Sequence, residues 1–215
     1  PLDQSGYTEA FLLIDGLWFG RWFVIMVYRQ STNLFLLHIA IAGRETVTKI
    51  ARVLYHVFSF GYHFSGIVSD GGTGIKSAIE TVFGNIPHQI CLAHLHRQAT
   101  NSLGRYPKDE RVKLLRQLAD HLWLIESKEA LRWWQRELKS WIRSNWDYLQ
   151  EYRRDEQGYW WYIHKGVRKA VRILLTAPDY SFTFLTHHLM PKTTNEIEAT
   201  FGHLGKRWLS HRGLK

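Results

Sequence analysis

The amino-acid sequence predicts a mixed α/β protein in which a helical region is inserted before the last helix. Over residues 10–106, short apolar runs alternate with amphipathic stretches in the order β-β-β-α-β-α-β-α. This order favours a five-stranded mixed sheet flanked by helices over a doubly wound parallel sheet. Residues 107–185 instead carry charged, Trp-rich segments whose apolar residues keep helical spacing, with no strand-like alternation.

The first three strands are predicted as a meander. Residues 10–15 form a continuous apolar run that ends at Asp15, which is typical of a central strand buried on both faces. Two further β-rich runs follow at residues 22–29 and 33–41, separated by a polar Gln-Ser-Thr-Asn turn.

Helices and two more strands follow in alternation. An amphipathic helix is predicted at about residues 45–60, and a short strand at 66–69 ends at Asp70. The glycine-rich segment 71–74 then turns the chain into a second helix, and a fifth strand at about 88–92 leads into a third.

Three divisions of the chain follow from these patterns. Residues 1–106 are predicted as the first part of the α/β core and residues 107–187 as an all-α insertion. Residues 188–215 are predicted as the C-terminal core helix, which begins near Thr194 and has apolar residues at helical spacing.

Composition favours a polyanionic partner. Lys and Arg total 28 against 19 Asp and Glu, a formal net charge of +9, which fits nucleic acid first and an anionic membrane surface second. No apolar run reaches the length of a membrane span. The single cysteine, Cys91, excludes an internal disulfide framework and fits a reducing compartment.

Two aspartates follow apolar strands. Asp15 is followed by Gly16, and Asp70 is followed by glycines that let a ligand approach closely. Ligands of open α/β sheets gather outside the carboxyl ends of strands, so the two carboxylates together indicate a cation site. The alternatives are a strand-to-turn Asp that bonds the next backbone amides, for Asp15, and an N-cap or Asx-turn residue, for Asp70.

A third carboxylate, Glu198, lies at the start of the last predicted helix. It is next to the apolar Ile197, and we expect it at the margin of the buried stripe. The alternative is a helix cap, because Thr193 to Glu196 has a capping-box pattern and acidic residues in a first turn suit the helix dipole.

A cysteine and three histidines lie close together in the chain. Cys91 and His94 form a C-x-x-H pattern, with His88 and His96 nearby. Structural zinc usually needs two pairs of ligands, and the second pair is missing, so a buried thiol and a histidine at a helix start are preferred to a zinc site.

Basic residues flank these points and are candidates for phosphate contacts, with a solvated helix face as the alternative for each. The candidates are Lys76, Arg97, Arg105, Lys206, Arg207 and Arg212. Trp133 or Trp134 of the helical region could stack on a base, although Trp134 lies on an apolar stripe that favours core packing.

Four motifs follow one another along the chain: LLIDG, VSDGGTGIKSAI, CLAH and TTNEIEATFGHLGKR. In this order and spacing the chain resembles the catalytic domain of DDE transposases of the Mutator-like type, which have a ribonuclease H-like core. The short tail SHRGL is similar to the prokaryotic, insertion-sequence members.

The resemblance implies a catalytic and metal-binding triad of Asp15, Asp70 and Glu198. Glu198 is preferred to Glu196 because it is the Glu of the Asn-x-x-Glu motif that begins at Asn195. Cys91 and His94 match the family's C-x-x-H, which implies a site-supporting or DNA-related role rather than catalysis.

The resemblance also implies an activity and partners. Two Mg²⁺ or Mn²⁺ ions would serve cleavage of transposon-end DNA and strand transfer into target DNA. We expect a homodimer in the active complex, no membrane partner, and a cytoplasmic, nucleoid-associated location in a prokaryotic cell.

Other interpretations remain open. A catalytically silent DNA-binding remnant and a ribonuclease H-like nuclease without strand transfer are the alternatives to a transposase. The chain begins with Pro1, and only about ten residues precede the first predicted strand. We therefore expect a catalytic-domain fragment, or the product of a decayed or split element, without the DNA-recognition domain usual in such transposases.

Overall fold

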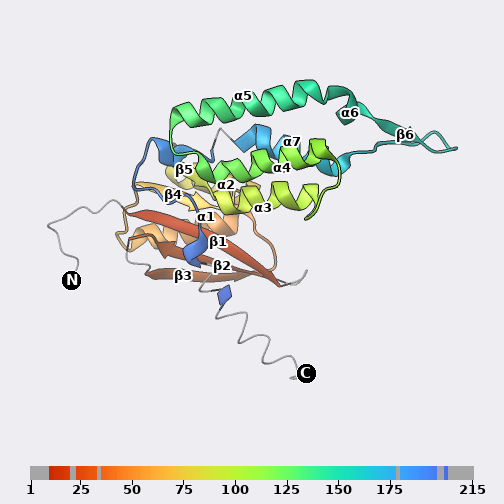
Figure 1. Cartoon of the computed structure of the whole chain (residues 1–215). Helices are drawn as coiled ribbons and strands as arrows, with labels where there is room; N and C mark the ends of the chain where they lie inside the picture. Colours follow the sequence, from red (N-terminus) through yellow and green to blue (C-terminus); the bar gives the residue numbers. More distant parts are fainter. Residues whose placement is uncertain (1–9, 20–22, 33–34, 178–179, 198–200, 203–215) are drawn as a thin grey trace. The chain divides into compact units, whose positions relative to one another are not determined.

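The computed structural model describes residues 10–19, 23–32, 35–177, 180–197 and 201–202. The chain divides into two compact units. The first comprises residues 1–91 and 186–215, and the second comprises residues 92–185 (Figure 1). The second unit therefore begins with the helix after the fifth strand, at Leu92.

The first unit contains a five-stranded mixed sheet in the order β3-β2-β1-β4-β5. β1, β2 and β3 pair as an antiparallel meander, and β4 and β5 continue the sheet parallel to β1. The predicted mixed sheet is thus confirmed. The strands are β1 Phe11–Phe19, β2 Phe23–Gln30, β3 Leu36–Ala42, β4 Gly66–Ser69 and β5 His88–Ile90.

The prediction that the first strand ends at Asp15 was wrong. β1 continues to Phe19 and stays paired with β2 up to Phe23. What ends is the pairing with β4, whose last partners are Ile14 and Ser69. Asp15 therefore lies where β1 extends beyond its parallel neighbour.

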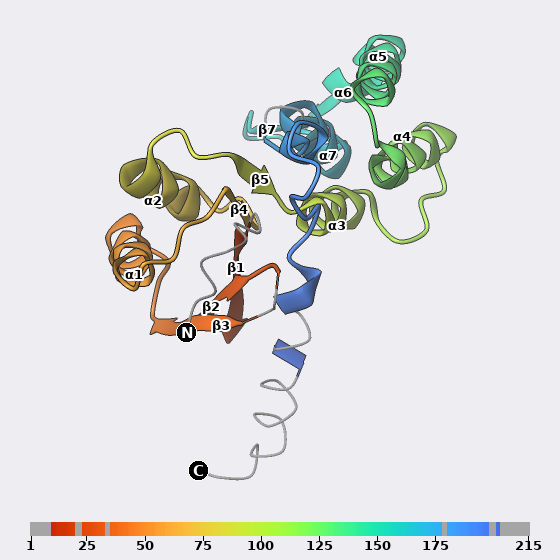
Figure 2. The same cartoon turned by 90° about the vertical axis from the view of Figure 1, so that its left-hand side faces the viewer.

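Two helices cover one face of this sheet (Figure 2). They are α1, Val47–Ser59, and α2, Thr73–Phe83, and both were predicted. The hydroxyl of Thr46 caps α1 by accepting from the Lys49 N–H. Leu12 and Ile14 of β1 belong to the core under these helices, so the alternation of a strand places Leu13 and Asp15 on the opposite face.

The second unit is mainly helical and packs around buried apolar and Trp side chains. Trp134 is fully buried, and its indole N–H donates to the Leu118 carbonyl at 2.7 Å. Core packing therefore accounts for Trp134, as its apolar stripe predicts. The helices are α3 Leu92–Leu103, α4 Glu110–Asp120, α5 Lys128–Ser144, α6 Trp146–Gln150 and α7 Lys165–Thr176.

The prediction of an all-α insertion was wrong. β6, Tyr152–Arg154, and β7, Trp160–Tyr162, form an antiparallel hairpin that projects from the helices of this unit (Figure 1). Asp155 accepts from two backbone amides of the turn, and Gly158 has φ 87°. Residues 151–160 are all exposed, so the hairpin has no buried face to produce an alternation of apolar and polar residues.

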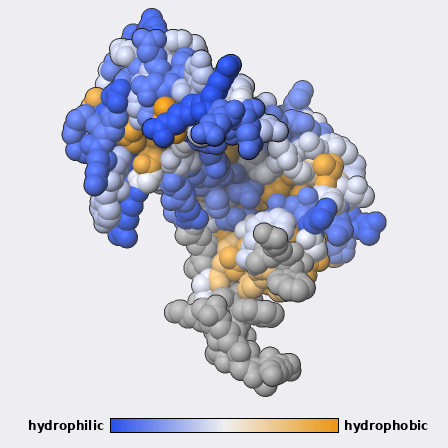
Figure 3. All heavy atoms as spheres, turned by 90° about the vertical axis from the view of Figure 1, so that its right-hand side faces the viewer, coloured by the Kyte–Doolittle hydropathy of each residue, from blue (hydrophilic) through white to orange (hydrophobic). Residues whose placement is uncertain are grey.

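The face of the molecule drawn in Figure 3 carries both hydrophilic and hydrophobic residues, and the hydrophobic ones lie in groups. Among the described residues, no helix has the length and apolar character that a membrane crossing requires.

Candidate acidic site

Asp15 is a buried carboxylate, and each of its two oxygens accepts a hydrogen bond. Only 2% of the Asp15 surface is exposed to solvent. Oδ1 accepts from the Gly16 N–H at 2.8 Å, and Oδ2 accepts from the Thr194 hydroxyl at 2.8 Å. The expected bond to the following amide is present, and the second bond links β1 to the segment that precedes the last predicted helix.

Cys91 anchors Thr194 in this position. The thiol is fully buried, and its sulfur accepts from the Thr194 backbone N–H at 3.3 Å. The Cys91 N–H itself donates to the Ser69 carbonyl at 2.7 Å, which continues the pairing between β4 and β5. The buried thiol of the sequence prediction therefore supports the group that bonds Asp15.

Asp70 follows β4 and forms a tight turn. Its Oδ1 accepts from the Gly72 N–H at 2.9 Å, the pattern of an Asx turn, and Gly71 adopts φ 78°. The N-cap of α2 is Gly72, not Asp70. Of the two local alternatives, the Asx turn is thus present and the N-cap is not, and the turn uses only one carboxylate oxygen.

Ser69 and His88 fix the strand ends behind Asp70. Ser69 Oγ accepts from the Gly71 N–H at 3.2 Å and lies 2.8 Å from His88 Nε2. Burial, followed by the positive charge of Lys76, lowers the pKa of His88 to about 4. The imidazole is therefore neutral at neutral pH and serves as a hydrogen-bonding partner of Ser69.

The structure adds Glu45, which the sequence did not single out. Its Oε1 is shielded from solvent and finds no hydrogen-bond partner in the described part of the chain. A Cβ atom built on Gly16 would lie only 2.6 Å from this oxygen, so Gly16 provides the space that Glu45 occupies. The pKa of Glu45 is raised, first by burial and then by the negative charges of Asp70 and Asp15.

Asp15, Asp70 and Glu45 thus converge from β1, the β4–α2 turn and the residue before the α1 cap. Like charges in one place raise the free energy of the folded state unless protons or cations neutralise them. Hard carboxylate oxygens suit Mg²⁺ or Mn²⁺. A nearby cation would also stabilise the buried Glu45 oxygen, which has no hydrogen-bond partner among the described residues. Among the described residues, no group of three or more His, Cys, Asp or Glu side chains is placed so that it could hold a metal ion. Mg²⁺ commonly binds through one or two carboxylates together with phosphate oxygens and water.

Several predicted site residues cannot be placed. Glu198, Lys206, Arg207 and Arg212 lie outside the described residues. Asn195 is exposed, and its N–H donates to the Thr193 hydroxyl at 3.4 Å. The competitor Glu196 is also exposed, and its carbonyl accepts from Arg29 of β2 at 3.0 Å.

The remaining candidates lie on separate elements. Lys76 of α2 is 3.9 Å from Glu80 one turn later in its helix. Arg97 and His94 belong to α3 of the second unit, and Arg105 stacks on Tyr106 there.

The preference against zinc stays a prediction. His96 bonds Asp120 at 2.7 Å, while the Cys91 sulfur bonds Thr194.

The fold and site define a mixed α/β protein with a carboxylate cluster where parallel strands end. The family model described as Transposase, Mutator family matches residues 36–199, more than half of the chain. The chain therefore belongs to the Mutator family of transposases, proteins that act on DNA. The matched range includes Asp70 and Glu198 and leaves out Asp15, whose placement rests on the structure. A search of curated proteins found no match.

Proposed function

We propose that this chain is the catalytic domain of a DNA transposase with a ribonuclease H-like core, which cleaves transposon ends and transfers the strand to target DNA. The observation that carries the proposal is the convergence of Asp15 and Asp70 at the end of the parallel β1–β4 pairing, beside the unpaired Glu45 oxygen. Membership in a transposase family supports DNA as the substrate.

The chain's own residues hold the reacting groups in place. Asp15 and Asp70 are the ligands proposed for divalent cations, and Glu198 is the third ligand predicted by its motif. Bound Mg²⁺ or Mn²⁺ would activate the attacking water or 3′ hydroxyl and stabilise the leaving oxygen. Thr194 and the Gly16 amide orient Asp15, and the Gly72 amide orients Asp70. Catalysis then depends on positioning and charge neutralisation without a covalent protein intermediate.

The decisive experiment compares Asp15→Asn, Asp70→Asn and Glu198→Gln with the wild-type chain on pre-cut and intact DNA ends. Cleavage and joining are followed on gels with Mg²⁺, with Mn²⁺ and with EDTA. The exposed Glu137→Gln on α5 is a matched control for loss of one carboxylate. We expect cleavage to fall by about 10³-fold or more in the site variants and to stay unchanged in the control.

The products also separate the competing functions. If both Asp variants cleave DNA as fast as the wild-type chain, the proposal that this chain is an enzyme with its site at these residues is excluded. Cleavage without joining favours a nuclease, and DNA binding without either reaction favours a silent remnant. The predicted homodimer is checked by light scattering of the chain with its DNA.

A further inference from the structure

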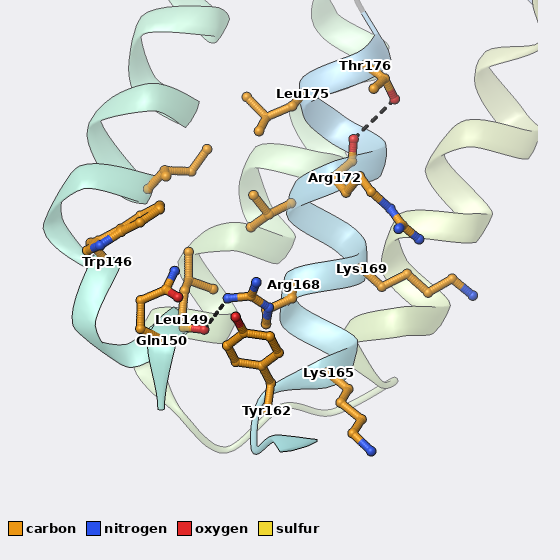
Figure 4. Close-up of a pocket in the computed structure, with 12 residues that line it drawn as sticks. Trp146, Leu149, Gln150, Tyr162, Lys165, Arg168, Lys169, Arg172, Leu175 and Thr176 are labelled. Carbon is orange, nitrogen blue, oxygen red and sulfur yellow. Dashed lines mark hydrogen bonds between the residues drawn. The ribbon is translucent and has the colours of Figure 1, made fainter. Parts of the chain in front are cut away.

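The second unit has a long trough on its surface between α6, α7 and the hairpin (Figure 4). Its central part has a volume of about 500 Å³ and shares Gln150 and Tyr162 with a hollow of about 330 Å³ at the hairpin. At its other end it shares Ile142 and Leu175 with a hollow of about 340 Å³ beside α5. The three hollows therefore form one continuous path across this unit.

The charges along the trough are of one sign. The described residues that line it include no Asp or Glu. Its cations come from α5, the hairpin and α7, and they are Lys139, Arg143, Arg154, Lys165, Arg168, Lys169 and Arg172. A linear polyanion is the ligand that such a path complements.

Three of these cations form a row. Lys165, Lys169 and Arg172 are exposed and recur at i, i+4 and i+7, so they share one side of α7 (Figure 4). α7 itself contains no acidic residue. The spacing suits successive phosphates of a nucleic-acid backbone better than a single point charge.

Two carboxylates near the trough, Glu151 and Asp155, are held by other groups. Glu151 bonds His164 at 2.9 Å, and Asp155 accepts the amides of the hairpin turn. These contacts fix both carboxylates in interactions that do not include the trough cations.

Aromatic rings line the path as well. Trp146, Tyr152 and Trp160 line the path and are each more than half exposed. The Arg168 guanidinium lies over the Tyr162 ring, 3.5 Å from its centre, and the Trp160 ring meets Tyr162 edge-on with 5.2 Å between the ring centres. Exposed rings beside a track of cations are the usual platform for unpaired bases.

We propose that this trough binds a single-stranded segment of DNA, with phosphates on the α7 cations and bases against Trp146, Tyr152 and Trp160. An unpaired strand is favoured over a duplex because a duplex hides the faces of its bases within the stack, whereas the trough offers rings for those faces to meet. That the bound strand belongs to a DNA end being processed rests on the proposed function; the binding itself does not require catalysis.

The test measures binding without cleavage. Fluorescence anisotropy in EDTA compares a labelled single-stranded oligonucleotide with the duplex of the same sequence, at several salt concentrations. The variant Lys165→Gln/Lys169→Gln/Arg172→Gln is compared with Lys113→Gln/Lys128→Gln/Arg132→Gln, three cations outside the trough. We expect the trough variant to bind the single strand at least tenfold more weakly. Its log–log salt slope should fall by about 2, since each phosphate contact contributes about 0.7. The control should stay within twofold of wild type.

A second variant separates stacking from charge. Trp146→Ala combined with Trp160→Ala should weaken single-strand binding by about fivefold or more while leaving duplex binding unchanged. Equal losses for strand and duplex, or no loss in either variant, would overturn the proposal. Tighter binding of poly-glutamate than of the oligonucleotide would assign the trough to an acidic peptide instead.

Lysine footprinting tests the same binding on the wild-type chain, so its result does not depend on whether a variant folds. The oligonucleotide should protect Lys165 and Lys169 from acetylation and leave Lys113 reactive; unprotected trough lysines would contradict the proposal.

Asp15→Asn and Asp70→Asn should keep single-strand binding while losing cleavage. If they cleave normally and the trough variant still loses binding, the proposed function fails and the trough assignment stands.

Discussion

In the first compact unit, the carboxylates of Asp15, Asp70 and Glu45 converge in a partly buried site, whereas in the second, cations line an exposed trough with no described Asp or Glu. The acidic groups are oriented by backbone amides and by Thr194, while the α7 cations project from an exposed helix side. The difference teaches that net charge describes neither region. The overall +9 favours DNA binding, yet the proposed chemistry depends on local negative charge that only cations or protons can neutralise.

The largest effect is expected where the two regions differ most, in the need for a carboxylate. Asp70→Asn keeps an oxygen for the Gly72 amide but removes the charge. We expect cleavage to fall by about 10³-fold or more with single-strand binding unchanged, measured by single-turnover kinetics and anisotropy. A parallel loss of binding and cleavage would mean that the two regions are not separable.

The next effect concerns stability against pH and is confined to the acidic region. His88 has a pKa of about 4 in the folded chain against an ordinary value of 6.5, so the unfolded chain binds the proton first as the pH falls. The contribution of His88 is complete above about pH 6.5 and is lost progressively down to about pH 4. It amounts to at most about 3 kcal/mol.

Urea unfolding at several pH values checks this prediction, with His88→Gln as the comparison. The variant should lack this part of the pH dependence. An identical pH profile for both proteins would contradict the assignment to His88.

A smaller effect tests whether Glu45 and Gly16 are coupled. In Gly16→Ala the new Cβ would meet Glu45 Oε1 at 2.6 Å and Val24 at 3.2 Å. We expect a loss of about 1–3 kcal/mol in the free energy of unfolding. Part of it should be recovered in Gly16→Ala/Glu45→Ala, because that change removes the crowded oxygen. Purely additive losses in this double-mutant cycle would show that the two residues do not interact.

The smallest effect is expected in the hairpin. Gly158 has φ 87° with open space around it, so Gly158→Ala strains only the backbone of the turn, by about 1 kcal/mol. Single-strand affinity should fall about two- to threefold through a less ordered hairpin, and cleavage of pre-cut ends should not change. Gly61→Ala, with φ 81° in the first unit and equally open surroundings, is the matched control and should leave single-strand affinity unchanged.

Elements with a buried apolar pattern could be predicted from the sequence. α1 and β4 lie within two residues of their expected bounds, and α2 follows the glycine-rich segment as predicted. The extension of β1 beyond Asp15 was missed because Gly16 interrupts the apolar run, although β2 continues to pair with it. The hairpin was missed because residues 151–160 are exposed on both sides and have no period.

The acidic site could be predicted only in part. Asp15 and Asp70 are marked by the apolar strands before them, because a carboxylate at such a point is costly without a partner. Glu45 follows no strand directly and precedes a helix cap, where acidic residues are common, so local sequence gives no sign of it. Its one signal is Gly16, whose missing side chain leaves the space for its oxygen. The part of Glu198 in the site stays a prediction.

Because side chains alternate between the two faces of β1, the proposed activity depends on the number of residues that precede Asp15 in this strand. Leu12 and Ile14 face the helices, and Asp15 lies on the other face at the point where β4 stops. A conservative exchange of one apolar residue for another in this strand leaves that arrangement intact. Deleting or inserting a single residue before Asp15 would turn the carboxylate toward the helices and place an apolar side chain beside Thr194. Evolution of this segment is therefore expected to proceed by substitution, with its residue count held constant.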